Sequence, residues 1–234
     1  MIRYRTTWGI LCQFVMCFLI IIASCKERAE LGTDLSDFYL PLDSLDGVGS
    51  RYIYKNLIDS NREPEIWQHI KTSEGQITSI NYDHVQQVVQ KQYERVVETG
   101  VLVDSLVLFF YDSTGIATSI PVKVHSANRF PFGVPDTTVV WLSHFEWWQP
   151  GDSLHVILER RRSFDGDTIW NWGGKEVPAV KFHTSDKFET EQVGWTTSGW
   201  EGQEIYAKGI GLVYYRRDIS PQLRLAFQLE KITR

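Results

Sequence analysis

Apolar and polar residues alternate along most of this chain, and clusters of Gly, Pro, Asp and Ser separate the alternating runs. The segment 119–125 shows the pattern, since Ile120, Val122 and Val124 are interleaved with polar residues. Successive side chains of a strand point to opposite faces, so a period of two indicates a β-strand with one buried face. Many short strands joined by tight turns predict a mostly β fold. We expect a single antiparallel meander curled into a half-barrel or a sandwich.

Turn signals mark where the expected strands end. Asp-Ser-Thr-Gly at 112–115 follows the nearly continuous apolar run 101–111, which is typical of a strand buried on both faces. Asp-Gly-Asp at 165–167 also predicts a turn, and the further oxygen ligands of a calcium loop are absent around it. Residues 203–216 are expected to form one strand.

The segment 84–98 fits two kinds of secondary structure. Its valines lie at helical spacing, and Gly100 stands where a helix could stop. Valine is a poor helix former, however, and a hairpin through residues 99–100 would pair this segment with the run 101–111. We therefore favour a strand here, and we expect the domain to contain at most one helix.

The N-terminal segment has the organisation of a secretory signal peptide. Arg3 and Arg5 form a basic start, residues 14–22 form a short apolar core, and small residues precede Cys25. The apolar stretch is shorter than the roughly 20 residues of a membrane-spanning helix. Ile-Ala-Ser-Cys at 22–25 resembles a bacterial lipobox, which implies cleavage before Cys25 and acylation of that cysteine by palmitate-like chains. Several acyl chains give a stable membrane anchor.

The sequence therefore divides into a lipoprotein signal peptide (1–24), a lipidated N-terminus with a charged tether (25–37) and one antiparallel β-domain (38–234). An ordinary secreted protein cut at the same place would keep a lone free thiol, which is unusual in an oxidising compartment. The lipobox resemblance implies an outer-membrane location. Lys-Glu-Arg at 26–28 partly resembles the surface-export signal of Bacteroidota lipoproteins, but its arginine breaks that pattern. The periplasmic and the cell-surface faces of the membrane both stay open.

Composition limits the chemistry of the mature domain. All three cysteines, Cys12, Cys17 and Cys25, lie at or before the cleavage point, so no disulfide is expected after processing. The formal charge of −5 becomes −7 when Arg3 and Arg5 are removed. An acidic domain lacks the basic face that nucleic acids require, so we expect no nucleic-acid partner. Envelope proteins remain open as partners.

A glycine-containing motif lies near the C-terminus. Tyr-Ala-Lys-Gly-Ile-Gly-Leu-Val at 206–213 resembles the closing segment of uncharacterised secreted β-proteins and lipoproteins, which are similar to the curled sheets of the LolA and LolB lipoprotein carriers. The resemblance implies a half-barrel whose concave side holds an apolar ligand such as an acyl chain. Gly209 and Gly211 are expected to permit a bulge or a close backbone approach within a strand.

No catalytic or metal-binding motif stands out. His144 and Glu146 share one strand face, but the usual spacing of metal ligands is missing, and a polar strand surface explains them better. A nucleophile elbow is absent from the sequence. We therefore expect a non-catalytic protein that needs neither a metal nor a cofactor.

Charged residues leave two further functions open. The arginines at 160–162 place guanidinium groups on both faces of a strand, where they pair with acidic neighbours or form an anion site. A carboxylate-based hydrolase would need two acids at a separation that the fold sets. The available acids are Glu146, Glu159, Asp165 and Asp167.

Tryptophans are the best candidates for binding, although core packing accounts for most aromatic residues of a β-protein. Trp195 and Trp200 flank a Thr/Ser/Gly stretch that we expect to be a loop, while Trp147 and Trp148 close a strand. Exposed aromatic residues mark binding surfaces. We expect a binding or scaffold module of the cell envelope that holds a lipid-like ligand, or alternatively a surface protein that binds glycans through these tryptophans.

Overall fold

The computed structural model describes residues 33–59, 61–135, 139–151 and 154–234. The signal peptide, Cys25 and the first part of the tether lie outside the described residues. Residues Thr33–Arg234 form one compact unit. Within this unit no helix has the length and apolar character to cross a bilayer.

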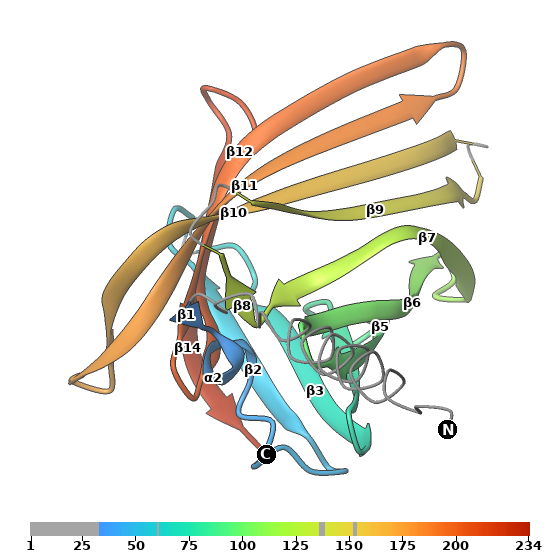
Figure 1. The fold of residues 1–234 in the computed structure, drawn as a ribbon. Helices are drawn as coiled ribbons and strands as arrows, with labels where there is room; N and C mark the ends of the chain where they lie inside the picture. Colours follow the sequence, from blue (N-terminus) through green and yellow to red (C-terminus); the bar gives the residue numbers. More distant parts are fainter. Residues whose placement is uncertain (1–32, 60, 136–138, 152–153) are drawn as a thin grey trace, which may run out of the picture. The chain divides into compact units, whose positions relative to one another are not determined.

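The compact unit consists almost entirely of strands (Figure 1). In chain order the elements are β1 (Thr33–Asp34), α2 (Ser36–Tyr39), β2 (Ser50–Asn56), β3 (Glu65–Ser73), β4 (Gln76–Tyr82), β5 (Val88–Val97), β6 (Gly100–Tyr111), β7 (Ala117–Pro131), β8 (Gly133–Val134), β9 (Val140–Gln149), β10 (Leu154–Trp172), β11 (Lys175–Glu191), β12 (Trp195–Ala207), β13 (Gly211–Asp218) and β14 (Arg224–Thr233).

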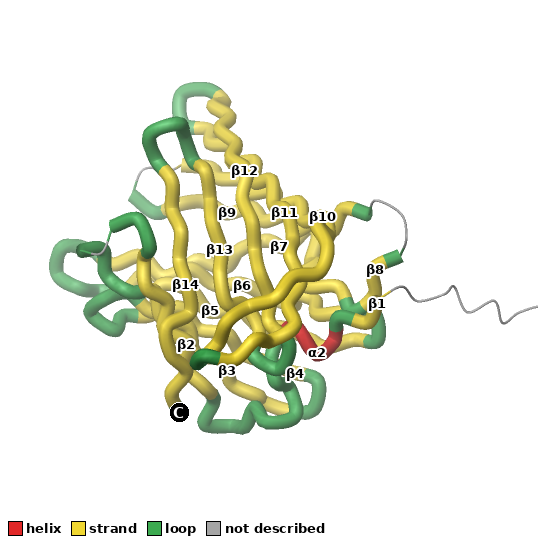
Figure 2. Tube along the Cα trace, turned by 90° about the vertical axis from the view of Figure 1, so that its left-hand side faces the viewer, coloured by secondary structure: helices red, strands yellow, loops and turns green. Residues whose placement is uncertain are grey.

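Twelve of these strands close into an antiparallel barrel (Figure 2). Neighbours in the barrel are nearly always neighbours in the chain, so the predicted antiparallel meander is confirmed. The prediction of a half-barrel or sandwich is wrong, because β14 pairs with β2 from Phe227↔Asn56 to Thr233↔Arg51. That pairing satisfies the backbone groups that two open sheet edges would leave exposed.

Three segments test the strand and turn signals of the sequence. The favoured strand over 84–98 is confirmed as β5, which forms a hairpin with β6. The predicted turn at 165–167 is wrong: β10 continues through it, and the register shifts between Phe164 and Asp167 as in a β-bulge. The stretch from Trp195 to Trp200 is likewise not a loop, because all of it belongs to β12.

The predicted single strand over 203–216 is also wrong. The chain turns at residues 208–210 and returns as β13. Gly211 nevertheless provides the close backbone approach that its sequence context suggested. Its φ is +105°, and an added Cβ would lie 2.5 Å from the carbonyl oxygen of Tyr39. No L-residue fits there without moving the short helix α2.

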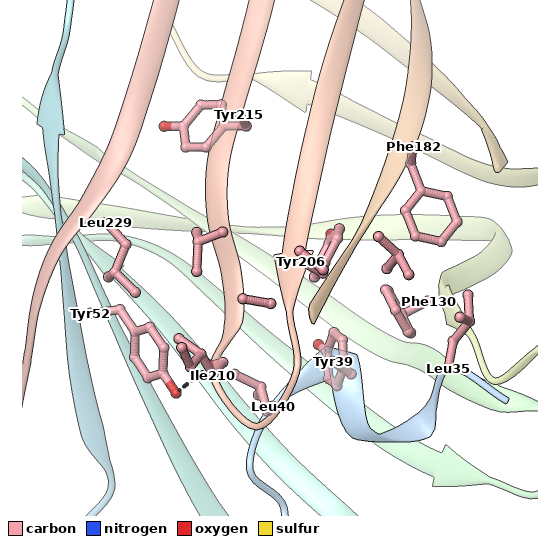
Figure 3. Close-up of a cluster of buried hydrophobic side chains, with 14 of the residues drawn as sticks. Leu35, Tyr39, Leu40, Tyr52, Phe130, Phe182, Tyr206, Ile210, Tyr215 and Leu229 are labelled. Atoms are coloured by element: carbon pink, nitrogen blue, oxygen red, sulfur yellow. Dashed lines mark hydrogen bonds between the residues drawn. The ribbon is translucent and has the colours of Figure 1, made fainter. Parts of the chain in front are cut away.

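The short helix α2 closes one end of the barrel interior. Leu35, just before it, is fully buried, and Tyr39, its last residue, is 2% exposed. Figure 3 shows both beside aromatic side chains of the core. The ring centroids of Tyr39 and Phe130 lie 5.3 Å apart. The core of the compact unit therefore begins before residue 38, within the range predicted as the tether. Tyr52 completes this packing by donating a 2.9 Å hydrogen bond to the carbonyl of Ile210.

Candidate functional site

Charged side chains fill the part of the barrel interior beyond this apolar core. Strand alternation explains their placement: on β10, Arg160 and Arg162 point inward, whereas Arg161 is exposed on the outer face. Arg129 from β7 and Arg217 from β13 also reach the interior. Together these four arginines line a cavity of about 220 Å³.

Arg160 is paired with a buried carboxylate. Its Nε and Nη2 each donate a 2.6 Å hydrogen bond to Asp186 of β11, a fork geometry that suits guanidinium and carboxylate. Burial alone would raise the pKa of Asp186, but the Arg160 charge outweighs it and the pKa is lowered. Asp186 therefore stays ionised, and it also accepts a 3.0 Å hydrogen bond from the Trp200 indole.

Arg162 forms the second paired unit. Its Nε donates to Glu204 of β12 at 2.8 Å, and both side chains are less than a tenth exposed. Burial favours the neutral acid, yet Arg162 and Arg160 together lower the pKa of Glu204. The hydroxyl of Tyr206 adds a 2.9 Å hydrogen bond to the same carboxylate. A buried charge needs this kind of compensation to be tolerated.

Arg129 is less completely partnered. Its Nε lies 3.7 Å from Glu94 Oε1, and this buried atom has no hydrogen-bond partner among the described residues. Glu94 instead accepts hydrogen bonds from the hydroxyl of Tyr39 at 2.6 Å and from the amide of Gln92. Burial raises the pKa of Glu94 above its usual value, even though Arg129 acts in the opposite direction.

Arg217 lies at the other end of this charged set. Within the described part of the chain no carboxylate comes within 4.0 Å of its guanidinium, which lies over the ring of Tyr215 at 5.3 Å. Burial lowers the pKa of Arg217, and repulsion from Arg160 lowers it further. An additional negative charge close to Arg217 would therefore stabilise its charged form.

The cavity therefore offers donors to an anion. Arg160 and Arg162 are hydrogen-bonded to carboxylates, whereas Arg129 and Arg217 make no hydrogen bond to a carboxylate of the described residues. A guanidinium matches carboxylate or phosphate oxygens in its planar fork. The volume corresponds to roughly seven water molecules at about 30 Å³ each, which limits the ligand to a small molecule. The lining also contains His69 and Gln92, so its chemistry is more polar than an acyl chain prefers.

The four predicted tryptophans separate into two pairs on opposite faces of the sheet. Trp147 and Trp200 are on the inner face, where their ring centroids lie 6.1 and 6.2 Å from that of Phe188. Trp148 and Trp195 are on the outer face and are 58% and 52% exposed. The expectation that Trp195 and Trp200 act together is therefore not met by their positions.

The remaining candidates lie on the outer surface. His144 stacks on His125, and Glu146 hydrogen bonds to both His125 and His155. No cluster in the described residues brings together three side chains able to hold a metal ion. Among the other candidate acids, Glu159 pairs with Arg161 and Asp165 with Lys181 at the surface, and Asp167 is exposed.

Several charged residues of the interior were not identified from the sequence. The arginines at 160–162 suggest an anion site, but the partners of Arg160 and Arg162 lie on two other strands, as Asp186 and Glu204. A partial signal was present: Asp186 and Glu204 each take an inward position in a strand, where an apolar residue is the usual choice. The residues missed are Arg129, Arg217, Glu94, Asp186 and Glu204.

Comparison with solved structures finds one protein with a similar fold and a second, more distant one. A solved structure of a Parabacteroides distasonis protein assigned as a lipoprotein matches with a TM-score of 0.51 and 11% identity, covering 86% of this chain and 99% of that one. A second, the Escherichia coli (K12) protein YmcC, also assigned as a lipoprotein, gives a TM-score of 0.37 and 8% identity over 94% of this chain and 96% of its own. No family model and no curated protein matches the sequence. The first likeness establishes the shared fold.

Proposed function

We propose that this chain is a lipid-anchored binding module of the bacterial envelope that holds a small anionic ligand inside its barrel. The observation that carries the proposal is the cavity lined by Arg129 and Arg217, two partly buried arginines that make no hydrogen bond to a carboxylate of the described residues. A ligand carboxylate or phosphate would supply the missing acceptors.

The anchor is the second part of the proposal. The lipobox at Cys25 supports acylation, and a fold shared with a protein assigned as a lipoprotein agrees with it. We place the module in the outer membrane. A labelled palmitate analogue should be incorporated by the native chain in a bacterial host and not by Cys25→Ala. Label retained by Cys25→Ala would remove the anchor from the proposal.

A small anion fits the interior better than the acyl chain suggested by the LolA and LolB resemblance. An acyl chain would lie against four guanidinium groups and gain nothing from them, while separating them from water. A phosphate or carboxylate gains a charge-assisted hydrogen bond at each donor that it reaches. The barrel interior thus combines a polar ligand cavity with an apolar core that closes one end.

Native mass spectrometry of the full mature lipoprotein, released gently from detergent, is the first test. A bound mass of small-molecule size is expected. Calorimetry with inorganic phosphate and with short dicarboxylates then identifies the class of anion. Arg217→Gln should weaken binding at least about tenfold, because one charged donor is lost.

The matched control for this variant is Arg216→Gln. Arg216 is the preceding residue of β13, lies outside the cavity lining and pairs with Asp218 at 3.2 Å. Its substitution should leave anion binding unchanged. Equal losses in the two variants, or an apo mass together with no heat from any anion, would overturn the proposed ligand class.

A further inference from the structure

A second set of residues crosses four neighbouring strands on the outer face of the barrel. Trp148 of β9 pairs with His155 of β10, His155 with Glu191 of β11, and Glu191 with Trp195 of β12. Figure 1 shows these four strands running side by side. Because directly paired residues point to the same face, the four side chains form one continuous outer row.

The aromatic rings of this outer row contact one another. The Trp148 and His155 rings are stacked, with centroids 4.5 Å apart and planes at 12°. Trp195 meets the other side of His155 edge-on at 5.4 Å. The histidine side chain is 12% exposed and lies between two indoles that are each more than half exposed.

Two carboxylates lie beside these rings. Glu146 Oε1 is 3.1 Å from His155 Nε2, and Glu191 Oε2 is 3.7 Å from His155 Nδ1. Glu146 is held from its other side by His125 and by Lys123 at 3.4 Å. Glu191 is 43% exposed, so its oxygens keep acceptor capacity for a ligand.

The geometry points to a carbohydrate-binding site at this outer row, in which a pyranose ring stacks on Trp148 or Trp195 and donates hydroxyl hydrogen bonds to Glu191 and Glu146. The C–H face of a sugar is apolar and flat, and an indole gives it a large rigid contact at little entropic cost. Carboxylates accept the hydrogen bonds of the hydroxyl groups at the ring edge. Without a ligand, two half-exposed indoles in one row leave a large apolar surface in contact with water, which is unfavourable.

The charge of the site selects among sugars. Glu146 and Glu191 repel a uronic or sialic acid, whereas an amino sugar gains a charge-assisted hydrogen bond and an interaction with an indole face. The site therefore takes neutral and amino sugars of a glycan. The interior cavity, by contrast, takes an anion, so the two sites differ in ligand as well as in position.

Glycan arrays probed with the full mature lipoprotein test this inference. Binding to glycans that end in neutral or amino sugars is expected, with little signal on acidic glycans. Trp148→Ala and Trp195→Ala should each lower affinity about tenfold or more in calorimetry with the best array glycan. Glu191→Gln should remove the preference for amino sugars while neutral sugars still bind.

Tyr93→Ala is the matched control, because Tyr93 is an aromatic residue of β5 with 40% exposure and takes no part in the outer row. The Tyr93→Ala variant should bind the glycan with the affinity of the native chain. Arg217→Gln should also bind glycans normally, so failure of the anion proposal and failure of this one are distinguishable. A blank array overturns the inference, and so does glycan binding that survives both tryptophan substitutions in folded protein.

Discussion

The inner and outer faces of β9–β12 are built from the same strands, yet their charges and aromatic rings are used in opposite ways. On the inner face, Arg162 lies against the buried Glu204 and Trp147 lies against the partly buried ring of Phe188. On the outer face, the neighbouring Arg161 and Trp148 are exposed. A shift of one residue along a strand therefore decides whether a side chain contributes to stability or is free to bind. Four predictions test this contrast.

The largest difference is expected between two adjacent arginines. Arg162→Met leaves Glu204 buried without its closest partner, which should cost about 3–5 kcal/mol of the free energy of unfolding. Arg161→Met breaks only an exposed pair with Glu159 and should cost less than about 0.5 kcal/mol. Urea denaturation of both variants measures the difference. Similar losses would contradict the assignment of the two faces.

Adjacent tryptophans give the next contrast. Trp147→Ala removes a half-buried indole from its contact with Phe188 and should destabilise the fold by about 2–3 kcal/mol. Trp148→Ala should cost below about 1 kcal/mol, because this indole is already 58% exposed. Thermal and urea unfolding of the pair provide the measurement. A larger loss for Trp148→Ala would show that the outer row is structural.

A histidine of the inner face makes stability depend on pH. Burial lowers the pKa of His69 from 6.5 to about 3, so the folded chain resists protonation that the unfolded chain accepts. Stability is thus fully present above pH 6.5 and is lost as the pH falls towards 3. Between pH 7.5 and 5 this single group should cost about 2 kcal/mol. Glu204, whose pKa is also lowered, adds its own loss only below about pH 4.5.

His69→Gln is the matched variant for this pH effect. Glutamine keeps a hydrogen-bonding group near Ser79, which lies 2.8 Å from the histidine ring, but it does not titrate. Chemical denaturation at the two pH values should therefore show a smaller difference for His69→Gln than for the native chain. An unchanged pH dependence would assign the effect to other groups.

The smallest effect concerns salt. A double-mutant cycle on Lys123 and Glu146, an outer pair at 3.4 Å, should give a coupling of about 0.5 kcal/mol or less that fades as NaCl rises from about 0.05 to 0.5 M. The same cycle on Arg162 and Glu204 should give a larger coupling that salt changes less, because both side chains are less than a tenth exposed. Equal salt sensitivity of the two coupling energies would contradict the difference between the inner and outer faces.

Local features of the fold could be predicted from the sequence, and long-range ones could not. The period of two fixed the β class, and the hairpin of β5 with β6 followed from the low helix propensity of valine and a nearby glycine turn. Barrel closure depends on the pairing of β2 with β14, whose residues are far apart in the chain. Nothing in either strand alone indicates which partner it finds.

The candidate sites show the same limit. Exposed tryptophans were expected to bind ligands, but register across β9–β12 decides which of them share a face. It places Trp148 and Trp195 in one outer row, where both contact His155, and Trp200 on the inner face. The turn signal at 165–167 failed because Gly166, with a φ of +96°, serves a bulge equally well. One residue of bulge or shift reverses which face a side chain occupies, and composition does not contain that information.

The short helix α2 also determines when, during synthesis of the chain, the barrel can finish folding. Its residues are among the first of the compact unit to leave the ribosome, but the partners that bury them, such as Tyr206, are among the last. Pairing of β2 with β14 must also wait for the end of the chain, since it joins Arg51 to Thr233. Contacts of such long sequence separation make folding slow. The barrel therefore becomes a single structure only when its final strand, β14, has been made and can pair with β2.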